Sequence, residues 1–388
     1  MNRPVGNAQL IQKMNRLRVL NYIRRNPDVA RPMIAHDTGL SLSSVTNIIS
    51  YLLSAGFVTE SGMEKAERVG RKGTLLRFGA NAYGIVCIFF AVGNVTISYT
   101  NLEGEIITRA SVNVDNLQPH KIVEIVRRNV STLLDEHGGN VLGIEIAISG
   151  LVLDGSRFVL SSSLKWKEID LKALLEAETG LPVFIENVSL LRAVWYFFCG
   201  GRTEKENMLF IDLENGVGAS QFYHGEMNRA MLGEIGHTTV EKDGEQCFCG
   251  NKGCLEAMFS EQRIMELYQT YGGNGKLTLS DLAERLAHCD AAAERSVSEC
   301  SQYLGIGLAN LVNLCKPSVI VINVGEFAVL RTVIERATAE MRKRAYPALL
   351  EELSVYEVSV SEEDTIRGAA FHLCDSLFDI SYSRNPID

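Results

Sequence analysis

The sequence predicts an α/β protein in which a small, mainly helical N-terminal domain precedes a larger body of alternating strands and helices. The length of 388 residues is too great for one ordinary core and favours two or three domains. The spacing of apolar residues also changes near residue 80, from helical stripes to runs typical of buried strands. We therefore divide the chain into residues 1–80 and residues 81–388.

The composition is that of a folded, water-soluble protein. Hydrophobic residues make up 46% and charged residues 22%, with 8 Pro, which excludes a disordered or low-complexity chain. The longest apolar run, residues 83–92, is far shorter than the roughly 20 residues that cross a bilayer. The first ten residues lack a secretory signal. We expect a cytoplasmic protein without a membrane partner, whose 9 Cys are reduced thiols or metal ligands.

Charge is unevenly divided between the two parts. Residues 1–80 carry 12 Lys and Arg against 5 Asp and Glu, whereas residues 81–388 carry 26 basic and 42 acidic side chains. A basic head on an acidic body favours contact between the head and a polyanion. A chance cluster is the alternative, so the pattern within the head must decide.

The head begins with two predicted helices. Pro27 ends the first, over residues 7–26, and the second covers residues 31–39 with Pro32 in its first turn and Gly39 as its stop. The apolar stripe of the first helix comprises Leu10, Ile11, Met14, Leu17, Val19, Leu20 and Ile23. Its basic residues Lys13, Arg16, Arg24 and Arg25 lie off this stripe.

A third helix follows a tight turn, with Ser41 as its N-cap and Ala55 near its end. Its inward stripe comprises Val45, Ile48, Ile49, Leu52 and Leu53. Its outward face carries short polar side chains suited to base edges and phosphates in a major groove, namely Ser43, Ser44, Thr46, Asn47 and Ser50.

Two strands, residues 57–60 and 74–78, complete the head, and the segment between them carries Arg71 and Lys72 on a Gly-flanked tip that could reach phosphate or a minor groove. This order of elements predicts a winged helix-turn-helix that binds double-stranded DNA through the polar face of the third helix and through Arg71 and Lys72. A structural or protein-docking head is the alternative.

The body alternates strand-like and helical runs. The strand-like runs are Ile85–Ala91, Val95–Tyr99, Ile106–Val114, Ile144–Ser149, Leu171–Glu178, Val183–Glu186, Met208–Leu213 and Val319–Val324. The helical runs are His120–Glu136, Val188–Phe198, Glu261–Tyr271, Ala291–Leu314 and Ala328–Arg344. Gly-rich turns such as residues 214–218 follow strands, a pattern that indicates two α/β lobes with ligands bound between them.

The strongest local signal is a metal loop within residues 237–256. His237, Cys247, Cys249 and Cys254 match a closed tetrahedral zinc site, and the ligand count leaves no open position for metal catalysis. Buried thiols or a redox pair are the alternatives. We interpret the other six cysteines as core residues, at positions 87, 199, 289, 300, 315 and 374.

Several motifs together resemble the ROK family (repressors, open reading frames, kinases), in particular its transcriptional repressors. They are Ala147–Gly150, Leu181–Asn187, the Gly-Glu-Ile-Gly-His of residues 233–237 and the Cys-x-Cys-Gly-x-x-Gly-Cys-Leu-Glu of residues 247–256. The resemblance implies a two-lobed, actin-like sugar-kinase fold with zinc beside the sugar pocket. It assigns sugar contacts to Gly150, Asn187, Glu234, His237 and Glu256.

The chain departs from the kinase pattern of that family at the catalytic base. Val188 stands where the resemblance implies a catalytic Asp, and a Val side chain cannot accept a proton from a sugar hydroxyl. The three expected nucleotide loops also differ, at residues 91–95, 214–218 and 323–325. We therefore expect no catalytic residue and no kinase activity.

The resemblance implies a sequence-specific transcriptional repressor of carbohydrate metabolism, xylose metabolism among the candidates. It would bind a DNA operator as a homodimer or tetramer, with a sugar as its effector. Two alternatives stay open. One is a sugar kinase with an appended DNA-binding head, and the other is a regulator controlled by a protein partner instead of a sugar.

Overall fold

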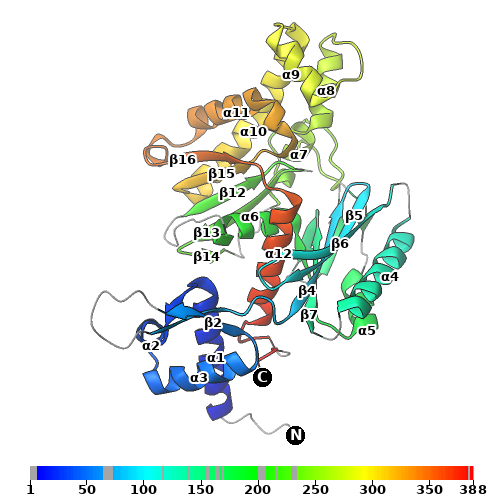
Figure 1. Cartoon of the computed structure of the whole chain (residues 1–388). Coiled ribbons are helices and arrows are strands. Elements are labelled where there is room, and N and C mark those ends of the chain that lie inside the picture. Colours follow the sequence, from blue (N-terminus) through cyan, green and yellow to red (C-terminus); the bar gives the residue numbers. More distant parts are fainter. Residues whose placement is uncertain are drawn as a thin grey trace.

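The computed structural model describes residues 7–63, 73–115, 118–137, 140–153, 157–161, 164, 166–167, 170–199, 207–214, 216–228, 234–382 and 385–387. A small head lies at one end of the molecule and is followed by two α/β lobes (Figure 1). Helices α6 (Val188–Cys199) and α12 (Glu362–Leu377) pack closely on each other in the middle. The chain ends beside the head, so its two terminal segments are neighbours in space.

Three helices and a small sheet form the head. They are α1 (Asn7–Arg25), β1 (Val29–Ala30), α2 (Arg31–Thr38), α3 (Leu42–Ser54), β2 (Val58–Met63) and β3 (Thr74–Phe78), and the antiparallel strand order is β1-β3-β2. Gly39 ends α2 in the left-handed conformation with φ 69°. The Ser41 hydroxyl caps α3 by accepting a hydrogen bond from the Ser44 backbone N–H at 3.2 Å.

The first lobe is built on a five-stranded sheet of order β11-β7-β4-β5-β6. Its strands are β4 (Gly84–Ala91), β5 (Asn94–Asn101), β6 (Ile106–Asn113), β7 (Val141–Ile148) and β11 (Val183–Asn187). Helices α4 (Pro119–His137) and α5 (Leu171–Thr179) contribute to the core on one face, while α6 and α12 pack on the other. Because β4 is covered on both faces, its sequence is almost continuously apolar.

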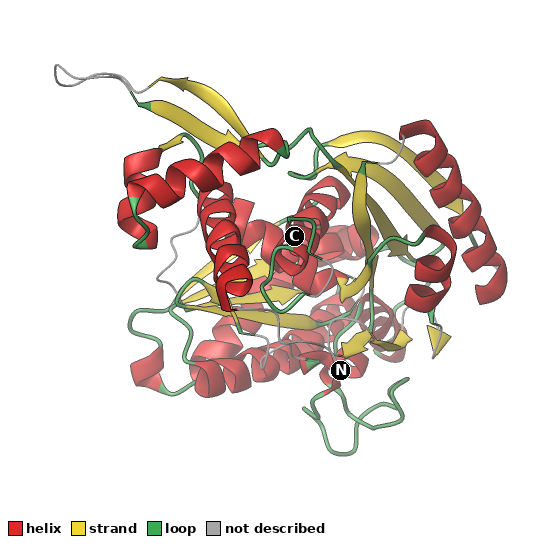
Figure 2. Cartoon of the chain, turned by 90° about the horizontal axis from the view of Figure 1, so that it is seen from below, coloured by secondary structure: helices red, strands yellow, loops and turns green. Residues whose placement is uncertain are grey.

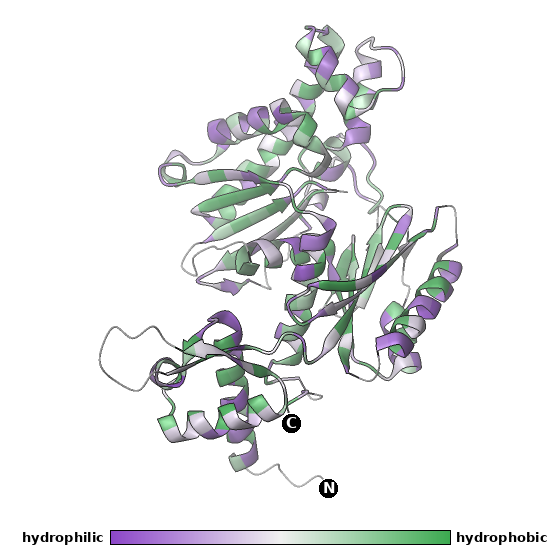
Figure 3. Ribbon diagram, viewed as in Figure 1, coloured by the Kyte–Doolittle hydropathy of each residue, from purple (hydrophilic) through white to green (hydrophobic). Residues whose placement is uncertain are grey.

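The second lobe has a five-stranded sheet of order β14-β13-β12-β15-β16. Its strands are β12 (Met208–Asp212), β13 (Gly218–Tyr223), β14 (Glu226–Met227), β15 (Val319–Asn323) and β16 (Ser354–Val358). One face packs against a layer that includes α7 (Leu255–Met258), α8 (Glu261–Thr270), α9 (Leu279–Ala287), α10 (Ala291–Cys315) and α11 (Arg331–Arg344). The central strands of both sheets are mostly hydrophobic, whereas α4 and α11 carry many polar residues (Figure 3).

Shorter elements connect these layers. Strands β8 (Leu151–Leu153), β9 (Arg157–Ser161) and β10 (Trp166–Lys167) form a small antiparallel sheet after β7. Three 3-10 turns occur at Ile235–His237 (η2), Gly325–Val329 (η3) and Pro347–Leu349 (η4).

The apolar core of the head continues into the body. One buried cluster joins Ile49 and Phe57 of the head to Ile366, Leu373 and Phe378 of the C-terminal segment. The ring of Phe378 meets that of Phe57 edge to face at 5.6 Å. Seen from below, the end of the chain lies against the helices of the head (Figure 2). The head is therefore packed on α12 and is not simply tethered to the body.

Three sequence predictions are wrong. Residues 171–178, expected as a strand, form α5, because the Asp170 carboxylate caps the helix by accepting from Ala173 N–H at 3.0 Å and Gly180 ends it with φ 68°. Leu10, Ile11 and Met14 are 46%, 54% and 41% exposed, because the core of the head begins only at Leu17. Cys199 and Cys289 are exposed instead of being core residues.

Within the described residues, no helix combines the length and hydrophobicity needed to cross a bilayer.

Candidate functional site

Four side chains of the second lobe converge into a compact group that could hold a metal ion. His237 comes from η2, Cys247 and Cys249 from the following loop, and Cys254 from the N-cap of α7. Their ligand atoms all lie within 4.8 Å of one another. The Sγ atoms of Cys249 and Cys254 are 3.7 Å apart, close to the roughly 3.8 Å edge of a tetrahedron with the usual Zn–S distance. The predicted ligands are thus brought together.

Backbone geometry closes this loop around the four ligands. The Cys247 N–H donates to the Asn251 carbonyl at 2.8 Å, and the Gly250 N–H donates to the Cys247 carbonyl at 3.0 Å. Gly253 has φ 66°, and a Cβ at this position would lie 1.5 Å from the Glu241 carbonyl oxygen. Burial raises the pKa of Cys254 to about 12, and the neighbouring Cys249 and Cys247 add to the shift.

The second lobe also gathers three of the predicted sugar contacts next to the metal group. His237 Nδ1 lies 3.6 Å from Cys247 Sγ, so Nε2 is left to face Glu234, whose Oε2 is 3.9 Å away. Burial raises the pKa of Glu234, with Glu256 adding to the shift and His237 opposing it. Glu234, His237 and Glu256 therefore form one polar group of paired donors and acceptors, the kind that binds vicinal hydroxyls.

The first lobe supplies Asn187 and Gly150 at the ends of adjacent parallel strands. The Asn187 amide donates to the Gly150 carbonyl at 2.7 Å, and its Oδ1 accepts from the Ser189 N–H at 2.7 Å. The Asn187 N–H donates to the Glu186 carboxylate at 2.8 Å. Asn187 is thereby held in one orientation at the start of α6.

A Gly-rich loop links the two groups of predicted residues. A Cβ on Gly218 would lie 2.6 Å from Ser189 Oγ, beside Asn187, while a Cβ on Gly216 would lie 2.7 Å from Glu256 Oε2. Both glycines therefore permit close approach, one to α6 and one to the metal loop. The loop is therefore in contact with residues of both groups.

Val188 does not point toward these polar residues. Its side chain is 4% exposed and belongs to the apolar cluster that contains Leu191, Ala369 and Leu373. Leu190 and Tyr196 of the same helix are buried as well. Val188, at the position where the resemblance implies an Asp, is thus part of the core between α6 and α12.

A buried ionic cluster in the second lobe was not predicted from the sequence. Arg192 of α6, 1% exposed, donates to Asp212 Oδ2 at 2.9 Å and pairs with Glu214 Oε1 at 2.9 Å. The Asn323 amide donates to Asp212 Oδ1 at 2.7 Å. Two of these groups, Glu214 and Asn323, lie in the loops expected to differ from nucleotide-binding ones. Arg192 therefore neutralises the carboxylates within that region.

The polar face of α3 is exposed as predicted. Ser43, Thr46, Asn47 and Ser50 are exposed and Ser44 is half-buried, while Val45, Ile48, Ile49 and Leu52 are buried beneath them. Arg71 and Lys72 lie outside the described residues.

The basic residues of α1 contact the end of the chain. Lys13 and Arg16 donate to the carbonyls of Tyr382 and Ile387, each at 3.4 Å. Arg24 and Arg25 both pair with Asp375. These four basic side chains of α1 therefore contact other parts of the same molecule. No local sequence signal indicated these contacts.

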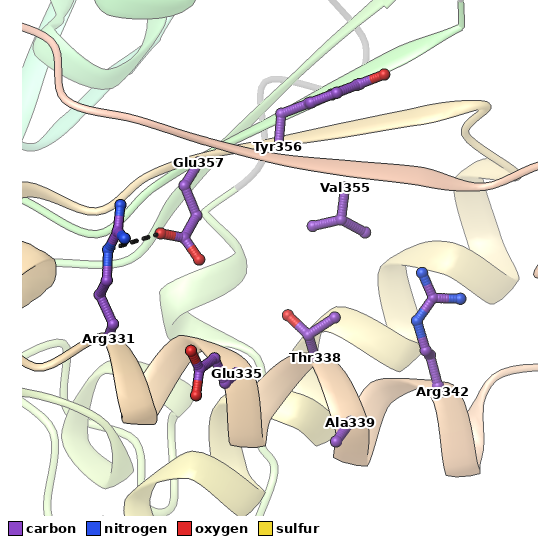
Figure 4. A pocket seen from close by; sticks show the side chains of 8 residues that line it. All are labelled: Arg331, Glu335, Thr338, Ala339, Arg342, Val355, Tyr356 and Glu357. Atoms are coloured by element: carbon purple, nitrogen blue, oxygen red, sulfur yellow. Dashed lines mark ion pairs between the residues drawn. The ribbon is translucent and has the colours of Figure 1, made fainter.

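A groove on the far side of the second lobe is separate from all of these residues. It has a volume of about 720 Å³ and lies between α11 and β16 (Figure 4). Its residues are Arg331, Glu335, Thr338, Ala339, Arg342, Val355, Tyr356 and Glu357. Arg331 and Glu357 form an ion pair across it at 3.8 Å. No predicted site residue lines this groove.

Two mixed sheets with helices between and around them, and a His-Cys group in the second lobe, define an α/β actin-like body of the sugar-kinase type. The chain belongs to the ROK family, whose family model matches residues 86–375.

The chain is similar to transcription regulators over nearly its full length. It is 25% identical to the xylose repressor of Bacillus spizizenii, covering 97% of this chain and 99% of that one. It is 24% identical to the DNA-binding transcriptional repressor Mlc of Escherichia coli, covering 95% of each. A crystal structure of a ROK family transcriptional regulator, a homologue of the E. coli Mlc protein, superposes with a TM-score of 0.79 at 22% identity, covering 93% of this chain and 96% of that chain.

Proposed function

We propose that this chain is a sequence-specific DNA-binding transcriptional repressor of carbohydrate-metabolism genes, relieved by a sugar bound between the lobes of its body. The observation that carries this proposal is the union, in one chain, of a three-helix head and a ROK body, matched over nearly its whole length by a xylose repressor and by Mlc. Residues 1–80 are the DNA-binding part and residues 81–388 the sensing and oligomerisation part.

The head acts as a winged helix-turn-helix. Helix α3 enters the major groove, because its outer face carries small polar side chains and its inner face is fixed by the core. The contacting residues are Ser43, Ser44, Thr46, Asn47 and Ser50, with Arg71 and Lys72 on the wing. Two copies in a homodimer or tetramer read a pseudo-palindromic operator in the cytoplasm.

The body binds a sugar through Gly150, Asn187, Glu234, His237 and Glu256. Support comes from the polar groups at the start of α6 and beside the metal loop, with the Gly216–Gly218 loop in contact with both. Xylose is the first sugar to test, since a full-length relative is a xylose repressor. Glucose and N-acetylglucosamine are the next.

The metal is a structural zinc ion held by His237, Cys247, Cys249 and Cys254. Three thiolates and an imidazole suit zinc in a closed, four-coordinate site. The ion would fix the ring of His237, so that Nε2 is presented toward Glu234 and the sugar.

Sugar phosphorylation is not part of this function. Val188 lies in the core and offers no base, and the loop of residues 214–218 departs from the nucleotide loop that the resemblance implies. A kinase would phosphorylate sugar with ATP and lose that activity in Glu234→Ala. No phosphorylated product is expected from this protein.

The test is fluorescence anisotropy with labelled DNA from upstream of the protein's own coding region. Thr46→Ala should weaken specific binding by about tenfold, the loss of one favourable base-pair contact. Thr132→Ala on α4 is a matched control, because both Thr hydroxyls donate to the carbonyl four residues earlier on an exposed helix face.

Sugars are then added to the wild-type complex. Release of the DNA by one sugar supports the sensor and identifies its effector. Specific binding that no sugar alters would contradict the sugar-sensing part and favour control by a protein partner. If the protein has no preference for any DNA sequence, the repressor proposal is wrong.

A further inference from the structure

Three titratable side chains are buried together between the first-lobe sheet and α12. Glu145 of β7 is 0% exposed, and Glu186 of β11 and His372 of α12 are each 3% exposed. His372 Nδ1 lies 3.0 Å from Glu145 Oε1, and its Nε2 lies 3.9 Å from Glu186 Oε2. The imidazole thus bridges two carboxylates that come from adjacent strands.

The strand register explains why both carboxylates face α12. In the parallel pair, Phe184 is opposite Glu145 and Glu186 is opposite Ala147, so the two Glu side chains are on the same face of the sheet. The surroundings on this face are otherwise apolar, with Cys87, Ala147 and Leu373 in the same cluster. Burial raises the pKa of Glu145, and His372 opposes that shift.

Such a cluster is a poor way to stabilise a core. Buried carboxylates and an imidazole lose their hydration, and well-packed apolar residues of similar size are often at least as stable. A sheet face that accepts Cys and Leu elsewhere does not require three polar groups. Their presence therefore points to a role in holding particular atoms in place.

On one side, this cluster is connected to the predicted sugar residues. Glu186 accepts the backbone N–H of Asn187 at 2.8 Å through Oε1, while its Oε2 faces His372. Asn187 in turn binds the Gly150 carbonyl with its side chain. A sugar hydroxyl that competes for Asn187 would alter this hydrogen-bond chain, and Glu186 carries the change to His372.

On the other side, the cluster is connected to the head. Asp375 lies three residues after His372 on α12, less than one helical turn away. Its carboxylate is 2.5 Å from Arg24 and 3.2 Å from Arg25 of α1. A rotation or shift of α12 that moves His372 must also move Asp375, because both belong to one continuous helix.

We infer that His372 is a positioning residue that couples Asn187 in the sugar site to α12 and, through Asp375, to the DNA-binding head. This inference rests on the proposed function and deepens it by naming the residue that transmits the effect of the sugar. The sugar and the operator DNA would then both act on α12. This helix would have two positions, and each ligand would favour one of them, as reciprocal coupling requires.

The test measures the release factor, which is the ratio of operator Kd with saturating xylose to operator Kd without it. If xylose does not release the wild-type protein from the operator but glucose or N-acetylglucosamine does, the sugar that does so is used instead. A factor of about 5–150 is typical of coupled sites. In His372→Gln we expect the factor to fall toward 1, with sugar Kd and sugar-free operator Kd within about threefold of wild type. His288→Gln, on the exposed end of α9, is the matched control and should keep the full factor.

A spectroscopic measurement separates coupling from mere stability. With histidine isotopically labelled, the ring resonances of His372 are those missing in His372→Gln. They should shift when the sugar is added to wild type, a response that a purely structural role of His372 does not predict. If His372→Gln does not fold, Glu186→Gln replaces it, because this change keeps the side-chain size and weakens the link to both neighbours.

The outcomes are distinct. A release factor in His372→Gln equal to that of wild type overturns the inference and leaves the repressor intact. Loss of operator binding without sugar in a folded variant also overturns it, because His372 would then be needed for DNA binding itself and not for the response to the sugar. If no sugar releases the wild-type protein from the operator DNA, the sugar-sensing part of the proposed function is wrong, and this inference is wrong with it.

Discussion

The guanidinium of Arg24, in the first helix of the head, lies 2.5 Å from the carboxylate of Asp375, in the last helix of the body. Arg24 is 5% exposed, and its guanidinium also lies 4.6 Å from the ring centre of Phe371. Arg25 shares the same carboxylate at 3.2 Å. One carboxylate of α12 thus pairs with two cations of α1 and links the head to the last helix of the body.

We expect Asp375→Asn to destabilise the protein by about 1.5 kcal/mol at pH 7, near the low end for a hydrogen bond to a charged group because Asp375 is 35% exposed. Burial opposes ionisation of Asp375, but Arg24 and Arg25 outweigh burial and lower its pKa. A lowered carboxyl pKa stabilises the fold above its unfolded value of about 3.9 and loses that effect as pH falls through the lowered value.

The difference between Asp375→Asn and wild type should therefore shrink as pH is lowered from about 5 toward 3. Urea unfolding at several pH values measures it. Asp135→Asn, an exposed carboxylate on α4, is the control and should cost little at any pH. Parallel stability curves for wild type and Asp375→Asn would contradict the lowered pKa.

A second prediction concerns the buried cluster around Arg192. Arg192→Met leaves the carboxylates of Asp212 and Glu214 without their cation, and Asp212 is 0% exposed. Breaking such a buried pair costs about 3–5 kcal/mol. Arg127→Met is the matched control, because the Arg127–Glu178 pair is partly exposed and should contribute little to stability.

Urea unfolding again measures both changes. The triple variant Arg192→Met, Asp212→Asn, Glu214→Gln should recover part of the lost stability, since it removes the uncompensated charges together with the cation. Equal losses for Arg192→Met and Arg127→Met would show that the cluster is solvated and does not act as a buried pair.

The third prediction concerns the metal. We expect one zinc ion per chain in protein purified without chelator, and Cys249→Ser should bring the content well below one by removing a ligand. Cys289→Ser changes an exposed cysteine outside the group and should leave the zinc content unchanged. Elemental analysis gives the ratio. Full zinc content in Cys249→Ser would exclude that cysteine as a ligand.

A fourth prediction concerns the cap of α3. Ser41→Ala removes the acceptor of the Ser44 N–H and should cost about 1 kcal/mol, as is typical of an N-cap. Ser54→Ala, at the other end of the helix, removes only a side-chain bond to the Tyr51 carbonyl and should cost less. Thermal unfolding compares them. A smaller loss for Ser41→Ala than for Ser54→Ala would contradict the cap.

Local signals explain which parts of the fold could be predicted from sequence. Pro27, Gly39 and Ser41 act on their own neighbours, so the helices of the head were placed within a few residues. The metal ligands were also found, because the three Cys lie within eight residues of one another and only His237 is farther away. In both cases, the physical cause lies in the residues that show the pattern.

Other features depend on partners that are distant in sequence. Arg24 and Asp375 are separated by 351 residues, and the polar residues His372 and Glu145 by 227, so no local pattern reveals either contact. Helix α12 was not predicted, although Ser361 and Asp364 form a capping box. It is covered on several sides by the sheet, α6 and the head, so its buried residues do not form a single stripe.

The last prediction concerns the two glycines of the metal loop. Gly250 and Gly253 both have positive φ, at 100° and 66°, so Ala strains the backbone at either position. They differ in space, since a Cβ on Gly250 meets nothing within 4 Å, whereas one on Gly253 would lie 1.5 Å from the Glu241 carbonyl oxygen. We expect Gly250→Ala to cost roughly 1–3 kcal/mol and to retain zinc. Gly253→Ala should cost more and lose zinc, because its backbone must move away from Glu241 and displace Cys254. Thermal unfolding with zinc analysis of both variants tests this order, and equal zinc content and stability would show that the loop yields at Gly253 without disturbing its ligands.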